Sequence, residues 1–100
     1  MPILERNVER SFVTRMKRIG VTTIKFTPTG HVGWPDRLVL IPGGSPLFIE
    51  FKRPGEVLRE RQQLVHRHLV ELGYNVRTFD DADKAVNYVI GMAHLEARRG

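Results

Sequence analysis

The sequence predicts an α/β fold in which a mixed β-sheet is flanked by helices. Residues 3–19 repeat apolar side chains at helical spacing, which indicates a first helix. Between residues 21 and 52, segments rich in β-branched and aromatic side chains alternate with glycine and proline, as strands and turns do. A helical pattern over residues 56–72 then precedes a further short strand, so it can connect two parallel strands. The predicted order of elements is α-β-β-β-α-β-α.

The first half of the chain reads as a helix followed by three strands. The helix stops at Gly20, and its apolar stripe comprises Val8, Phe12, Met16 and Ile19, with Val13 alongside. A strand is expected from about Val21 to Thr27, and the glycines and prolines of residues 28–35 predict a loop. Residues 36–42 and 46–52 are expected to form a hairpin around a Gly-Gly-Ser turn.

The second half reads as helix, strand and helix. The helix over residues 56–72 ends before Gly73, and its apolar stripe comprises Leu58, Val65, Leu69 and Leu72. Residues 74–79 form the fourth predicted strand. The acidic run at residues 80–83 supplies the N-cap and first-turn groups of a final helix, whose apolar positions are Ala82, Ala85, Val86, Val89, Ile90 and Ala93.

Length and composition restrict the class of protein. One hundred residues, 41% of them hydrophobic and 27% charged, fit one small globular domain over residues 1–100. The chain has no cysteine, which excludes disulfides and thiolate metal sites. It shows neither a secretory signal nor an apolar run long enough for a bilayer, so we expect a cytoplasmic protein without membrane partners. The net charge of +5 indicates a polyanionic partner, first of all nucleic acid.

The predicted hairpin carries charged residues where apolar ones are usual. Glu50 and Lys52 share one face of their strand with Phe48, while the alternate residues point to the main core. Asp36 opens the partner strand directly after Pro35, and the short turn sets it near Glu50 or Lys52. Charges inside a sheet are unfavourable alone, so the grouping indicates a functional site. The alternatives are a buried ion pair without a function, or a solvated sheet face with Asp36 as a turn residue.

The two predicted helices add polar groups that face the same region. Glu9 lies on the apolar stripe of the first helix, and Gln62 lies on the stripe of the second. Glu5, one turn before Glu9, is placed at the rim of the pocket. His66 and His68 are not at metal-ligand spacing for one helix face, and we read them as surface or substrate-proximal groups.

Carboxylates that lie close together favour a cation between them. Oxygen ligands without cysteine select a hard ion, Mg²⁺ or Mn²⁺. We expect Asp36 and Glu50 to bind this metal, with the backbone carbonyl of Phe51 and the Glu9 carboxylate, directly or through water, as further ligands. Lys52 would orient an attacking water or stabilise charge on a phosphate, so the pocket fits metal-assisted phosphodiester hydrolysis.

Basic and aromatic residues flank the predicted pocket. Lys25, Arg37 and Arg53 are the expected DNA phosphate contacts, with plain solvated surface charge as the alternative for each. Trp34 in the loop either stacks on a base, anchors the loop against the fold or forms a dimer contact.

The motifs "GWPDRLVL" and "FIEFKRPG", followed by a glutamine early in the next helix, resemble those of the PD-(D/E)XK nuclease superfamily. Within it, the sequence is similar to VRR-NUC domains of the short, stand-alone kind found in phages and prophages, from about Val8 to Phe79. The resemblance implies a restriction-endonuclease-like core, metal binding by Asp36 and Glu50, and Lys52 as the catalytic lysine.

The same resemblance implies that Glu9 is the first-helix carboxylate and that Gln62 supports the site. Family members resemble Holliday-junction resolvases, so the expected protein is a homodimer that cuts branched or flap-like DNA in the cytoplasm of a bacterial host. The expected function is therefore a divalent-metal-dependent DNA endonuclease, and the resemblance implies that it is encoded by a phage or prophage. A non-catalytic nucleic-acid-binding module on the same fold, and an RNA-directed or sequence-specific nuclease with the same core, are the alternatives.

Overall fold

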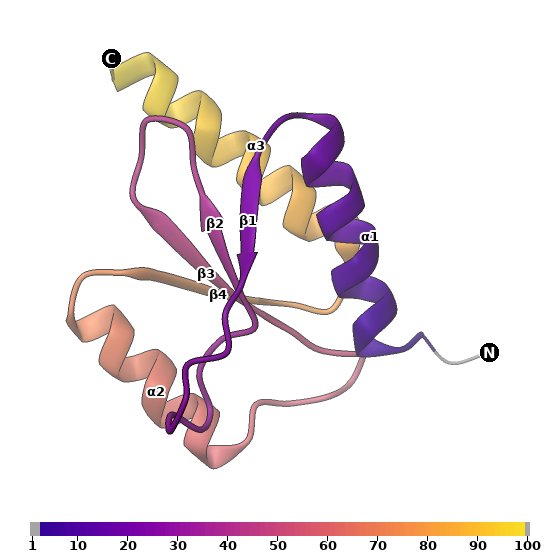
Figure 1. The fold of residues 1–100 in the computed structure, drawn as a ribbon, viewed down its shortest axis with the longest axis vertical. Helices are drawn as coiled ribbons and strands as arrows, with labels where there is room; N and C mark the ends of the chain where they lie inside the picture. Colours follow the sequence, from indigo (N-terminus) through magenta and orange to yellow (C-terminus); the bar gives the residue numbers. More distant parts are fainter. Residues whose placement is uncertain (1–2, 100) are drawn as a thin grey trace.

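The computed structural model describes residues 3–99. Its elements follow the predicted order (Figure 1), with bounds α1 Glu5–Arg18, β1 Thr22–Lys25, β2 Arg37–Leu40, β3 Pro46–Phe51, α2 Glu60–Glu71, β4 Asn75–Phe79 and α3 Ala82–Arg99. The four strands lie in the order β1-β2-β3-β4. The first three are antiparallel, whereas β4 runs parallel to β3. The mixed sheet and the parallel connection through α2 confirm the predicted fold class.

Helices cover both faces of the sheet, and each face has its own apolar core. α1 and α3 pack on one face, where the buried side chains include Phe12, Val39 and Phe51. α2 packs on the other face, against Phe48. This division follows from the alternation of side chains along β3, which is buried on both faces after Pro46. No helix within residues 3–99 has the length and apolar character needed to cross a membrane.

Three predicted core positions are wrong. Ile90, on the predicted apolar face of the last helix, is 38% exposed, and the other two lie at the ends of helices. Ile19 is 50% exposed and Leu72 is 60% exposed, because α1 ends at Arg18 and α2 ends at Glu71, each just before the predicted residue. Both side chains therefore lie beyond the last turn of their helix.

The start of α2 also differs from the prediction, since the helix begins at Glu60 rather than near Glu56. The amide of Arg59 donates to Oε1 of Gln62 at 2.9 Å, which satisfies an N-terminal donor and marks the start of the helix. Ahead of it, the amide of Arg53 donates to Oε1 of Glu56 at 3.1 Å. Glu56 therefore lies in the connection that follows β3, not on the helix.

The loop between β1 and β2 is held against α2. Gly33 has a φ of +85°, and a Cβ at this position would lie 2.8 Å from Cγ and 3.0 Å from the backbone of Arg61. Only glycine fits this backbone and this close approach without strain. Trp34 packs on Phe26 with ring centroids 5.8 Å apart, so it anchors the loop that ends at Asp36.

Candidate active site

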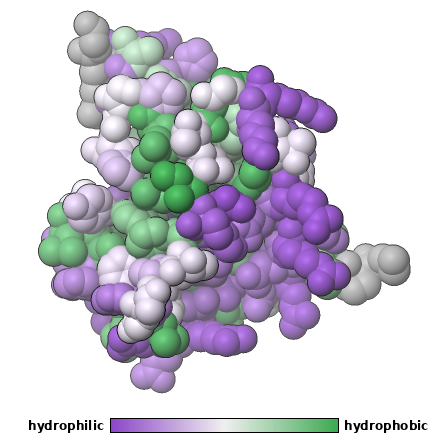
Figure 2. All heavy atoms as spheres, viewed as in Figure 1, coloured by the Kyte–Doolittle hydropathy of each residue, from purple (hydrophilic) through white to green (hydrophobic). Residues whose placement is uncertain are grey.

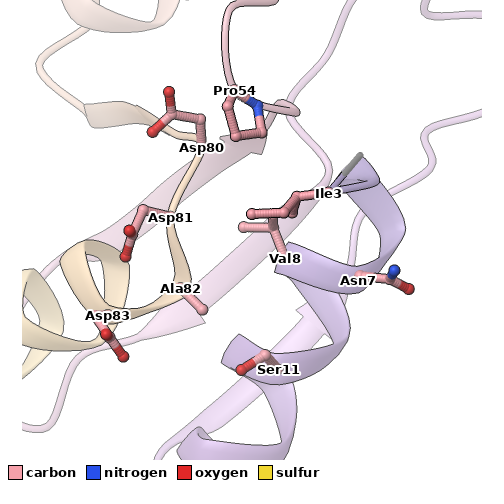
Figure 3. Close-up of a pocket in the computed structure, with 9 residues that line it drawn as sticks. All are labelled: Ile3, Asn7, Val8, Ser11, Pro54, Asp80, Asp81, Ala82 and Asp83. Atoms are coloured by element: carbon pink, nitrogen blue, oxygen red, sulfur yellow. The ribbon is translucent and has the colours of Figure 1, made fainter. Parts of the chain in front are cut away.

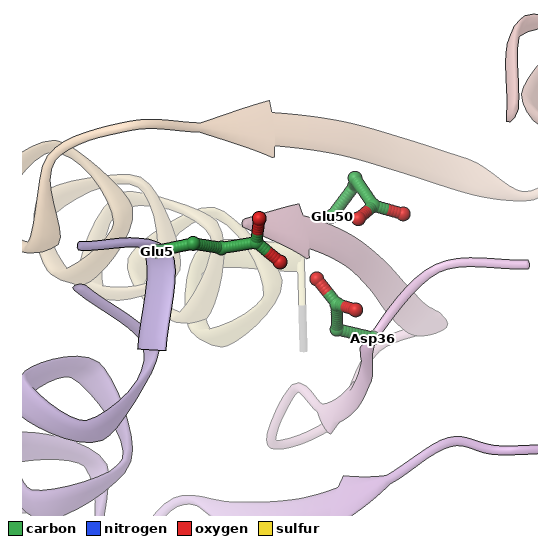
Figure 4. Close-up of side chains that lie close together, drawn as sticks. All are labelled: Glu5, Asp36 and Glu50. Carbon is green, nitrogen blue, oxygen red and sulfur yellow. The ribbon is translucent and has the colours of Figure 1, made fainter. Parts of the chain in front are cut away.

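Three carboxylates meet where β2 begins and β3 ends. Glu5, Asp36 and Glu50 each offer an oxygen that lies within 4.8 Å of the other two (Figure 4). Arg37 pairs with Ile49 in the β2–β3 register, which sets the preceding Asp36 beside the following Glu50. The amide of Phe51 donates to Oδ2 of Asp36 at 2.8 Å and holds that carboxylate in place. Glu5 reaches the group from the first turn of α1.

Glu50 is the most buried of the three. It is 2% exposed, and its Oε1 has no hydrogen-bond partner among the described residues. Burial raises the pKa of Glu50 to about 7, and the neighbouring Asp36 adds to this shift. His66 opposes it, but its Nε2 lies 3.8 Å from Oε1, too far for a hydrogen bond. At neutral pH this carboxylate therefore lacks the partners that an ionised buried acid needs.

Lys52 lies on the same side of the chain as Glu50 and is only 3% exposed. Its Nζ lies 3.9 Å from Oε2 of Glu56, with which it forms an ion pair. The amide of Arg53 lowers the pKa of the Glu56 carboxyl, and Lys52 adds to that effect. Burial raises the pKa of Glu5, as do Asp36 and Glu56, while Lys52 opposes the shift. One ammonium thus faces several carboxylates.

These residues fit a divalent cation. Three convergent carboxylate oxygens without cysteine are ligands for a hard ion such as Mg²⁺ or Mn²⁺. The orphaned oxygen of Glu50 is the strongest sign, since a buried acceptor without a partner is costly. Glu5, Asp36 and Glu50 would supply side-chain ligands, and Lys52 would remain close enough to act on a phosphate bound beside them.

Glu9 is not part of the acidic group. Its carboxylate accepts hydrogen bonds from Nζ of Lys25, at 3.0 and 3.2 Å, and from Nε of Arg37, at 2.7 Å. The structure thus brings together Asp36, Glu50 and Glu5, whereas the sequence predicts Glu9 at the metal and Glu5 at the rim. Lys25 and Arg37 are tied to Glu9 beside the site.

The other residues singled out from the sequence take different positions. Gln62 is half-buried and caps the amide of Arg59, as described above. Arg53 is exposed next to the centre, and its amide binds Glu56. His68 is exposed, as expected of a surface group.

Sequence reasoning missed two residues. His66 is buried and faces Glu50, so it is not a surface group, whereas its alternative role as a substrate-proximal group stays a prediction. A signal existed, because His66 lies four residues after Gln62 and three before the buried Leu69. Glu56, which faces Lys52, was read as the start of a helix, and no spacing rule distinguishes the two roles.

A separate hollow of about 420 Å³ lies between α1 and the turn into α3 (Figure 3). Its walls combine apolar groups such as Ile3 and Pro54 with Asp80, Asp81 and Asp83. Asp83 forms an ion pair with Arg15 of α1. Because its carboxylates would repel phosphate, this side of the molecule does not suit a nucleic acid.

Comparison with known proteins identifies the family. No family model matches the sequence. Over 81 residues the chain is 38% identical to "Putative nuclease p44" of Acyrthosiphon pisum secondary endosymbiont phage 1, a match that covers 81% of this chain and 87% of that protein. A solved structure of a VRR_NUC domain superposes with a TM-score of 0.74 at 27% identity, covering 87% of this chain and 94% of that one. The chain therefore belongs to the VRR-NUC nucleases, in their small phage-type form, and has their restriction-endonuclease-like fold.

Proposed function

We propose that the protein is a divalent-metal-dependent DNA endonuclease that hydrolyses phosphodiester bonds. The observation that carries this proposal is the group of Glu5, Asp36 and Glu50, with an unpartnered buried oxygen on Glu50. Lys52 lies buried next to the group. Membership of a nuclease family supports the reaction class.

Each residue of the centre has a proposed role. Glu5, Asp36 and Glu50 would hold Mg²⁺ or Mn²⁺, and the backbone carbonyl of Phe51 is the further ligand expected from the sequence. When bound, such an ion lowers the pKa of a water molecule and offsets negative charge on a phosphate. Lys52, which is only 3% exposed, would donate to the attacking water or to the phosphate oxygens on which charge develops.

Two groups around the centre act through these residues. Gln62 fixes the start of α2 and with it the helix that carries His66. The buried imidazole of His66 limits where the Glu50 carboxylate can turn. Neither residue needs to touch the substrate to affect catalysis.

The proposed substrate is branched DNA, such as a four-way junction or a flap, cut by a homodimer in the bacterial cytoplasm. Two active sites on one dimer would suit paired cuts on opposite strands of a junction. The support for this finer proposal is the resemblance to Holliday-junction resolvases described above.

The test is cleavage of a labelled four-way junction and its matched linear duplex in Mg²⁺, in Mn²⁺ and in EDTA. Asp36→Asn is the diagnostic variant, because it removes a negative ligand but keeps an acceptor for the Phe51 amide. Glu71→Gln removes a carboxylate from an exposed position at the end of α2 and serves as the control. We expect wild-type and Glu71→Gln protein to cut in both metals and Asp36→Asn to lose cleavage.

The ratio between the two substrates measures structure selectivity. Equal cutting of junction and duplex would refute the branched-DNA proposal but not the nuclease. Binding without cutting in either metal would favour the non-catalytic binding module.

A further inference from the structure

A basic groove, distinct from the acidic centre, lies between α1 and the adjoining ends of β1 and β2. It has a volume of about 350 Å³, and its charged walls are Arg6, Arg10, Lys17, Lys25 and Arg37 around a single carboxylate, Glu9. Figure 2 shows hydrophilic side chains gathered over α1 and the neighbouring end of β1. We refer to these six residues as the basic groove.

Two elements build the groove from opposite sides. Arg6, Arg10 and Lys17 are four and seven residues apart, so they follow one stripe along α1. Lys25 and Arg37 are direct partners in the β1–β2 register, and their side chains therefore share the face of the sheet that α1 covers. The five cationic side chains therefore lie along one continuous line, the basic groove, and are not dispersed over the surface.

The groove begins at the candidate active site. Arg6 directly follows Glu5, and Arg37 directly follows Asp36. Arg6 also lines a neighbouring hollow of about 430 Å³ together with Glu5, Arg53 and Glu56. A chain bound along the groove would therefore arrive next to the carboxylates.

Glu9 is held inside the basic groove by two of its cations. Its carboxylate binds both Lys25 and Arg37, and its side chain is only 13% exposed. Arg37 uses Nε for this contact, which leaves the terminal groups of its guanidinium as donors for a phosphate. Lys25 stays half exposed and keeps further donors.

We propose that the basic groove binds the phosphate backbone of the DNA on its way into the active site, and that Glu9 is a positioning residue that holds Lys25 and Arg37 for this contact. The proposal deepens the proposed function and rests on it. From Arg6 to Lys17 the stripe extends about 16 Å at 1.5 Å per residue. That length corresponds to about five phosphates of one strand at 3.4 Å each along a duplex.

The acidic side of the molecule supports this path. The hollow beside α3 carries Asp80, Asp81 and Asp83 and would repel phosphate. The groove carries five cationic side chains and one carboxylate, itself neutralised by two of them. A polyanion that approaches the centre is therefore attracted along the α1 side.

Measuring DNA binding in EDTA tests the proposed role of the basic groove independently of cleavage. Fluorescence anisotropy of a labelled 20-base-pair duplex would be followed in EDTA over a range of NaCl concentrations for wild-type protein and an Arg10→Gln, Lys17→Gln double variant. Each lost phosphate contact lowers the slope of log K against log salt by about 0.9, so we expect a fall of about 1.8. An Arg67→Gln, Lys84→Gln double variant removes the same charge from exposed positions on α2 and α3 and is the matched control.

The outcomes separate this proposal from the proposed function. If the salt slope of the Arg10→Gln, Lys17→Gln variant equals that of wild type, or if the control variant shows the same fall, the proposal that the basic groove binds DNA is refuted. Duplex binding with the expected slopes but no cleavage in any metal would refute the nuclease and leave the groove standing.

The role of Glu9 has its own readout in cleavage kinetics. Glu9→Gln removes a negative charge from the groove, so we expect DNA to bind more tightly and KM to fall. Lys25 and Arg37 lose their shared anchor, so we expect kcat to fall about tenfold or more as the strand is held less accurately. Unchanged kcat, or loss of kcat with a raised KM, would refute the positioning role.

Discussion

Replacing Glu50 with glutamine should make the metal-free protein more stable while abolishing cleavage. Glu50 is buried, its Oε1 has no partner among the described residues, and Asp36 lies beside it. An ionised carboxylate is unfavourable at this place until a cation binds. Glutamine is of similar size and carries no charge, so it removes the unfavourable term together with the proposed ligand.

The size of the effect follows from the pKa of Glu50, which rises from 4.5 to about 7 on folding. Because the folded protein keeps a proton that the unfolded chain releases, the free energy of unfolding falls as pH rises from about 4.5 to 7. This rise in the pKa of Glu50 corresponds to about 3 kcal/mol at pH 8. Below about pH 4.5 the carboxyl is protonated in both states, and the penalty is absent.

Urea unfolding in EDTA, followed by circular dichroism at pH 5 and pH 8, measures this difference. Glu50→Gln should exceed wild-type stability by about 1–3 kcal/mol at pH 8, and most of that gain should vanish at pH 5. Glu71→Gln, at an exposed position, should match wild type at both pH values. A Glu50→Gln protein that is less stable than wild type at pH 8, or a gain that does not depend on pH, would refute the reasoning.

The remaining predictions concern the lysine, the first-helix carboxylates and the loop. Lys52→Met should lower the cleavage rate at least about 100-fold while DNA binding in EDTA persists, because the ammonium acts on the charge that develops during reaction; a variant that cuts at the wild-type rate contradicts this. Glu5→Gln should weaken Mg²⁺ binding at least about tenfold by calorimetry, whereas Glu9→Gln should leave it unchanged; equal losses would place both at the metal. Gly33→Ala should lower the free energy of unfolding by about 1–3 kcal/mol in urea, since its backbone is left-handed; an unchanged midpoint would show that the loop relaxes.

Much of the fold was predictable because local signals agreed with one another. The apolar stripe of α1 contains Val8, Phe12 and Met16, and all three are buried. The alternation of side chains along β3 predicted the face of the strand on which Glu50 lies. The hairpin register predicted that Asp36 lies beside it. Helix ends were less accurate: the start of α2 depends on Gln62 reaching back to the Arg59 amide, a contact that periodicity does not encode.

The choice between Glu5 and Glu9 shows where sequence reasoning stops. The two residues are four apart, so they lie on one side of α1 and satisfy the same periodicity. What decides between them is the position of α1 along its own axis relative to the ends of the strands. The first turn of α1 meets the end of β3, which puts Glu5 among the carboxylates, whereas Glu9 lies level with Lys25 and Arg37. Packing between elements far apart in the sequence sets this position of α1.

The same geometry explains how one short helix can serve two opposite charges. A centre that holds a cation must be acidic, yet its proposed substrate is a polyanion that such a centre repels. α1 places Glu5 in the carboxylate group and the next residue, Arg6, at the entrance of the basic groove. Neighbouring residues would therefore bind the metal and the phosphates separately. Asp36 and Arg37 repeat this arrangement at the start of β2. Alternating charge along two segments, rather than one patch of either sign, is what allows metal and DNA to bind side by side.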